Sequence, residues 1–173
     1  FALLAASALA LAGCSSINTA LNTSKQPSME KLTPPSGQAF LTLEGSGIQI
    51  FRCAADAKGT YWRFEQPQAK LKDKSGEAVA ELSGPMSAFE YKDGSRIISS
   101  NIIAWADPAN PQKDNKYALM KAVSDPGTGV FNGVKYIQRL KPEGGMPNSS
   151  GCTPSEAGKL LKVPFYAEYV FWK

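Results

Sequence analysis

The chain has 173 residues, of which 43% are hydrophobic and 20% are charged, and its formal net charge is +4. This positive excess is small and scattered, because Lys70, Lys72 and Lys74 are interleaved with Asp73 and Glu77; nucleic-acid-binding proteins usually gather basic residues on one face, so nucleic acid is not an expected partner. The chain contains no histidine, which excludes the usual general base near neutral pH and the Ser-His-Asp and Cys-His arrangements.

The first element is an apolar, uncharged stretch at residues 1–11, which leads into Leu11-Ala12-Gly13-Cys14. It is too short to span a bilayer, which takes about 20 residues, and it is typical of the apolar region of a secretory signal peptide. We expect residues 1–13 to be the remnant of such a signal, preceded by a charged segment. The sequence ending at Cys14 resembles the lipobox of bacterial lipoproteins.

That resemblance implies cleavage before Cys14 and lipidation of its thiol with two or three acyl chains, which satisfies the two-signal requirement for stable anchoring. Ser15 rather than aspartate follows the cysteine, which by analogy with Gram-negative sorting favours the outer membrane, facing the periplasm. The expected location is therefore the bacterial cell envelope, with the membrane contacted through lipidated Cys14. The open alternative is an ordinary signal peptide cut nearby, with Cys14 unmodified.

Two further cysteines, Cys53 and Cys152, remain if Cys14 carries lipid. An even pair in an oxidising compartment predicts a disulfide, and the alternative is two unpaired thiols. No metal site and no cofactor are expected, because two isolated cysteines without histidine do not supply the usual zinc ligands.

Residues 14–38 form the predicted tether. They are rich in Ser, Thr, Asn, Gln and Pro, and such segments bury too little apolar surface to fold. A flexible chain of this length reaches roughly 25–30 Å, which is enough to hold a domain away from the membrane.

Residues 39–173 predict one antiparallel all-β domain, a β-sandwich or β-barrel of about eight to ten strands. Apolar and polar residues alternate over short runs that are separated by Gly and Pro, and Asp93-Gly94 is a strong hairpin signal. We expect strands at 40–44, 47–53, 60–64, 70–73, 77–82, 88–91, 96–99, 102–105, 118–123, 133–140 and 165–172.

Several short blocks follow one another in order, at 47–51 with Cys53, Trp62, 67–71, 84–85, 93–95, 127–130, 134–139, 144–147 with Cys152, and 163–169 with Phe171. Taken together, they resemble a bacterial and fungal family of secreted domains of unknown function. That family implies no established activity. This chain departs from it at Glu81, where the family tends to have histidine, and at residues 115–120, where the family has an apolar block.

No catalytic residue is assigned, since the chain has neither a Gly-x-Ser-x-Gly motif nor a supported Ser-x-x-Lys motif. A pair of carboxylates would still allow glycan hydrolysis if the two lay roughly 5–10 Å apart. The available acids are Glu81, Glu90, Asp93, Glu143 and Glu168, although Asp93 fits the role of a turn residue better.

Alternation in the strand around Gln138 and Arg139 places Arg139 on the side of Ile137 and Gln138 on the opposite side. A buried arginine needs a partner, and we expect a carboxylate such as Glu168. A barrel of about eight strands can hold one small ligand, for which the candidate binding residues are Tyr61, Trp62, Trp105, Tyr117, Gln138 and Arg139.

The sequence therefore favours a non-enzymatic function, namely binding of a small or extended ligand, or of an envelope protein, at the membrane surface. The alternatives left open are a carboxylate-based glycan hydrolase of the envelope or extracellular space and a purely structural domain.

Overall fold

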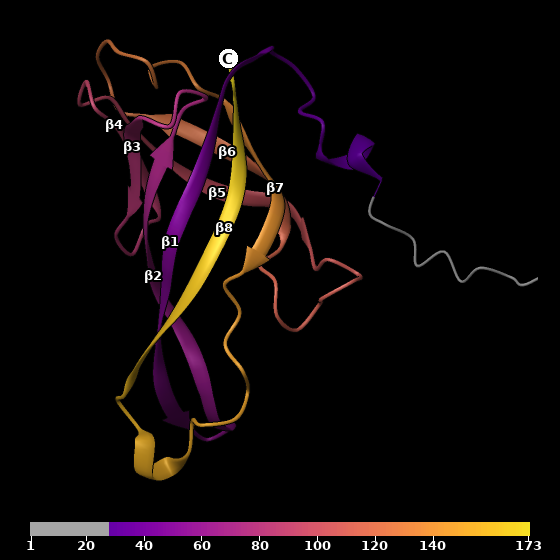
Figure 1. Ribbon diagram of the computed structural model, residues 1–173, viewed down its shortest axis with the longest axis vertical. Coiled ribbons are helices and arrows are strands. Elements are labelled where there is room, and N and C mark those ends of the chain that lie inside the picture. The colour runs from indigo at the N-terminus through magenta and orange to yellow at the C-terminus, as the bar shows by residue number, and fades with distance from the viewer. Residues whose placement is uncertain (1–27) are drawn as a thin grey trace, which may run out of the picture.

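The computed structural model describes residues 28–173, which form an eight-stranded antiparallel β-barrel closed between the first and last strands (Figure 1). The all-β prediction is confirmed, and the barrel rather than the sandwich is the architecture. The strands are β1 (Ala39–Asp56), β2 (Gly59–Lys72), β3 (Ala78–Ser83), β4 (Ala88–Tyr91), β5 (Arg96–Trp105), β6 (Tyr117–Ser124), β7 (Tyr136–Gly144) and β8 (Leu160–Trp172). Two short 3-10 helices, η1 (Met29–Leu32) and η2 (Pro154–Glu156), complete the elements.

Three strands are longer than the barrel needs. β1, β2 and β8 continue together past one end of the barrel as a twisted ribbon (Figure 1). There Cys53 of β1 is bonded to Cys152 in the β7–β8 connection, with 5.3 Å between their Cα atoms. The predicted disulfide is confirmed, and it attaches this long connection to the ribbon.

The opposite half of the barrel is filled with aromatic side chains. Inward-facing residues alternate along each strand, as expected for a sheet closed on itself. Phe89 packs edge-on against Tyr169 and Phe171 at centroid distances of 5.2 and 5.6 Å. Phe131, from the β6–β7 loop, lies 4.8 Å from Phe171 and closes this end.

The predicted hairpin turn at Asp93-Gly94 also holds the β6–β7 loop. Asp93 Oδ1 accepts hydrogen bonds from the backbone nitrogen and the hydroxyl of Ser95, at 2.9 and 2.6 Å. Its Oδ2 accepts one from the backbone nitrogen of Val130 at 2.7 Å, and Ser95 Oγ accepts one from that of Phe131 at 3.0 Å. One carboxylate thus connects the β4–β5 turn to the loop that plugs the barrel.

A segment before β1 packs on the outside of the barrel. Leu32 of η1 is fully buried, and its backbone oxygen accepts a hydrogen bond of 2.8 Å from Nε2 of Gln138 on β7. Residues 28–38 of the predicted tether therefore include a contact with the barrel, while Cys14, the predicted signal and the rest of the predicted tether lie outside the described residues. Within residues 28–173, no helix is long and apolar enough to cross a bilayer.

Candidate functional site

The half of the barrel next to the ribbon is hollow. It contains a cavity of about 500 Å³ that opens to solvent. One part of its wall is apolar and comes from Phe51, Phe64, Phe89, Met120, Met146 and Phe165. The other part is polar and comes mainly from Gln49, Ser99, Asn101, Asn115, Lys116 and Arg139. Such a wall suits a molecule that is apolar at one end and polar at the other.

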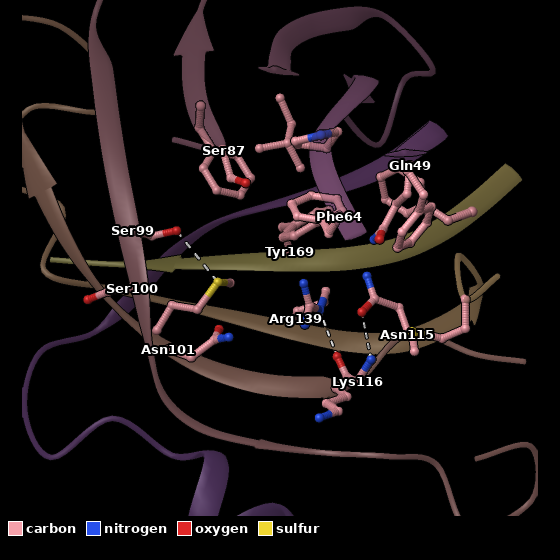
Figure 2. Close-up of a pocket in the computed structure, with 17 residues that line it drawn as sticks. Gln49, Phe64, Ser87, Ser99, Ser100, Asn101, Asn115, Lys116, Arg139 and Tyr169 are labelled. Atoms are coloured by element: carbon pink, nitrogen blue, oxygen red, sulfur yellow. Dashed lines mark hydrogen bonds between the residues drawn. The ribbon is translucent and has the colours of Figure 1, made fainter. Parts of the chain in front are cut away.

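Arg139 is the charged group of this wall (Figure 2). It lies on the same side of β7 as the core residue Ile137, as strand alternation predicts. Its Nε donates a hydrogen bond of 2.6 Å to the backbone oxygen of Lys116, and it stands opposite Tyr169 in the β7–β8 register. Burial lowers the pKa of Arg139, an effect that the neighbouring Tyr169 hydroxyl opposes.

The expected ion pair between Arg139 and Glu168 does not form. Glu168 is opposite Leu140 in the register and so points to the other face of β8, where Lys141 Nζ lies 2.9 Å from its Oε2. Among the described residues, no carboxylate lies within ion-pair distance of Arg139. The guanidinium therefore lines the cavity with its charge uncompensated.

Asn115 supplies a second free donor. Its Oδ1 accepts a hydrogen bond of 2.8 Å from the backbone nitrogen of Lys116. Its Nδ2 is buried and has no hydrogen-bond partner, although buried polar groups are normally paired. Figure 2 shows this nitrogen on the side of Gln49, with Arg139 nearby on the same wall of the cavity.

The Gly144-Gly145 block fixes this corner of the cavity. The backbone oxygen of Gly144 accepts a hydrogen bond of 2.6 Å from the backbone nitrogen of Asn115. A Cβ at Gly145 would lie 3.3 Å from Asn115 Cβ and 3.5 Å from Gln49 Nε2. Because Gly145 also has a φ of +90°, a side chain there would be strained and would press on Asn115 Cβ.

The sign of the charge in the cavity is positive. Lys116 lines the cavity together with Arg139, and no aspartate or glutamate belongs to the lining. Among residues 28–173, Lys116 has no carboxylate partner within 4.0 Å. The lining thus has the Arg139 guanidinium beside aromatic surface, with the exposed Lys116 at its edge.

The six candidate binding residues do not come together. Arg139 lines the cavity, whereas Gln138 lies outside the barrel, between Leu32 and Trp172. Trp105 and Tyr117 are opposite each other on β5 and β6. On the ribbon, the Tyr61 hydroxyl donates to Asp56 Oδ2 at 3.1 Å, and Trp62 lines a separate depression beside β8.

The five acids considered for hydrolysis lie away from the cavity lining. Glu81 and Glu90 are opposite each other on β3 and β4, where Glu81 forms an ion pair with Lys70. Glu168 is paired with Lys141, and Asp93 holds the β6–β7 loop. The described residues contain no group of three or more His, Cys, Asp or Glu side chains that could hold a metal ion.

Sequence reasoning missed Gln49, Asn115 and Tyr169 at this site. Gln49 could have been found from the sequence, because it is a polar residue on the same face of β1 as the apolar residues Leu43 and Phe51. For Asn115, the available indication was indirect. Adjacent glycines such as Gly144-Gly145 often allow another segment to approach the backbone closely, and Asn115 is one residue that does so. Tyr169 gave no signal that separates it from the other aromatic residues of β8.

Comparison with known families gives a match over most of the chain. The model of a family described as "Protein of unknown function (DUF3455)" matches residues 34–173, in agreement with the resemblance to an uncharacterised domain family. Neither a curated protein nor a solved structure matches the chain.

Proposed function

The chain belongs to the DUF3455 family of proteins of unknown function, and we propose that it works by binding a small amphipathic molecule inside its barrel. The observation that carries this proposal is the half-hollow lumen, in which a cavity of about 500 Å³ lies beside a packed aromatic plug. Ligand sites in proteins measure about 300–1,000 Å³ and are mostly apolar, with a few placed polar groups. A purely structural barrel has no need of such a space.

We propose that binding takes place at the surface of a bacterial membrane. The support is the signal-like segment and the lipobox ending at Cys14, which would attach the domain through lipid. The disulfide between Cys53 and Cys152 agrees with an oxidising compartment. A lipid-anchored barrel with an open lumen would hold its ligand near the membrane.

A neutral fluorescent dye tests the proposal on the full chain carrying Cys14→Ser, which removes the expected acylation. We expect Nile red to bind at one saturable site with a rise in fluorescence. The matched variants are Ser99→Phe, which places a ring in the cavity, and Ser46→Phe, which places the same ring on the exposed face of β1.

Ser99→Phe should weaken dye binding by at least about tenfold, equivalent to 1.4 kcal/mol, while Ser46→Phe should bind like the parent. Equal dye affinity in the two variants, or no saturable binding by the parent, would contradict a ligand site in the lumen.

A further inference from the structure

We infer that the ligand carries a carboxylate, which Arg139 and Asn115 bind, on an aliphatic or aryl tail that lies against the aromatic wall. This inference rests on the proposed function, since it names the chemical class of the molecule in the same cavity.

The first step of the argument is the geometry of Arg139. A guanidinium has five N–H donors in a rigid fork that matches a carboxylate. The Nε donor is already used by the backbone oxygen of Lys116, at 2.6 Å. This bond fixes the plane of the group, and the terminal nitrogens are left to serve the cavity and the Tyr169 hydroxyl.

The second step is the free amide of Asn115. The residue is only 7% exposed, and its Nδ2 is an unpaired donor. A buried donor without an acceptor is unfavourable, so the site gains stability when an oxygen atom arrives there. A carboxylate has two acceptor oxygens, one for Arg139 and one for Asn115.

The third step is charge. Arg139 is partly buried, and a cation that has lost part of its hydration is unfavourable without a counter-ion. The cavity lining offers Arg139 and Lys116 and no acid, so the protein itself does not compensate the guanidinium. An anionic ligand does so, and one negative charge suits a wall with one arginine and a lysine at its exposed rim.

The fourth step is the remaining wall. Phe51 and Phe64 are in edge-on contact at 5.6 Å, and Phe165, Met146 and Met120 complete the apolar part of the lining. Methionine side chains adapt to irregular apolar shapes. The cavity therefore fits a molecule whose charge is confined to one end.

The test compares ligands that differ only in the headgroup, using the full chain with Cys14→Ser and displacement of Nile red, supported by calorimetry. The pairs are decanoate with decanol and phenylbutyrate with phenylbutanol. We expect each acid to bind at least about tenfold more tightly than its alcohol, as a charge-assisted contact implies.

Arg139→Met should remove this preference by weakening the acids while leaving the alcohols within about threefold. Arg63→Met is the matched control, because Arg63 lies on the ribbon, is paired with Glu65 at 2.9 Å, and does not line the cavity. If Arg139→Met does not fold, the affinities of the acids and alcohols for the parent protein still test whether the site prefers a carboxylate.

Each outcome is distinct. Equal affinity of acids and alcohols, or displacement of the dye by neither, would overturn the carboxylate inference and leave lumen binding in place. Tighter binding of decyl phosphate than of decanoate by more than about tenfold would overturn it in favour of a phosphate site. Failure of Nile red itself to bind would reject the proposed function, and the inference with it.

Discussion

Arg139 and Lys116 are joined by a hydrogen bond of 2.6 Å from the guanidinium Nε to the backbone oxygen. This bond links the middle of β7 to the segment that leads into β6. It also holds the Arg139 guanidinium against the wall of the cavity. A backbone oxygen thus positions the guanidinium. The side chain therefore needs no protein carboxylate to keep it oriented toward a ligand.

Removal of the disulfide should strongly destabilise the fold. Cys53 and Cys152 are 99 residues apart, and the chain-entropy estimate for a loop of ~100 residues is about 4.7 kcal/mol. In a Cys14→Ser background, urea unfolding with and without reductant should show a fall in the free energy of unfolding of this order. The variant that also carries Cys53→Ser and Cys152→Ser should not respond to reductant. Identical midpoints for the parent with and without reductant would contradict the prediction.

Asp93→Asn should loosen the plug of the barrel. Hydrogen bonds from Ser95 and from the Val130 backbone hold the pKa of the Asp93 carboxyl below its ordinary value of 3.8. Because the folded pKa lies below the unfolded one, this contribution is present above about pH 4 and is lost as the pH falls through the folded pKa.

The measurement for Asp93→Asn is urea unfolding from neutral pH down to the acid range. The variant should be less stable than the parent at neutral pH, and the difference should shrink as the parent's carboxyl becomes protonated. Glu90→Gln, on an exposed carboxylate of β4, is the control. A constant difference at every pH would mean that the Asp93 charge is not what holds the loop.

Local patterns in the sequence predicted much of the fold. The alternation of polar and apolar residues predicted the β-segments, Asp93-Gly94 predicted a hairpin, and the cysteine count predicted the disulfide. The expected breaks within β1, β2 and β5 were wrong, because each of these is one continuous strand. Alternation also placed Arg139 and Gln138 on opposite sides of β7, with Arg139 on the side of Ile137. These features depend on residues that are close along the chain, on the alternation of faces along a strand, or on an even number of cysteines. A single sequence is therefore enough to predict them.

The partner of Arg139 and the cavity depended on information that one sequence does not carry. Glu168 lies on the strand that pairs with β7, so it was a reasonable candidate partner for Arg139. The register, however, places Tyr169 rather than Glu168 opposite Arg139. A shift of one residue sends a side chain to the other face. Whether a barrel is filled or hollow depends on side-chain volumes from several strands at once, which no single segment shows.

Gly45→Ala should destabilise the barrel. A Cβ at this position of β1 would lie 2.7 Å from Cε2 of Tyr169, and that ring is buried against Phe89. Overpacking of this kind costs about 1–3 kcal/mol, which thermal unfolding will detect. Ser46→Ala, one residue along on the exposed face, is the control and should be nearly neutral. Equal melting temperatures for the two variants would show that the Tyr169 ring is free to move.

Gln138→Leu should release the segment before β1 without changing the cavity. Gln138 Nε2 donates to the Leu32 backbone oxygen, and its Oε1 accepts from Trp172 Nε1, both at 2.8 Å. Leucine leaves the buried Leu32 oxygen and the part-buried Trp172 Nε1 unpaired, at a cost of about 1–3 kcal/mol. Urea unfolding should show this loss, and amide exchange at residues 29–34 should become faster. Gln68→Leu, on the exposed face of β2, is the control and should change neither property. If Gln138→Leu instead abolished Nile red binding with no loss of stability, Gln138 would be a ligand-binding residue rather than one that attaches the segment before β1 to the barrel.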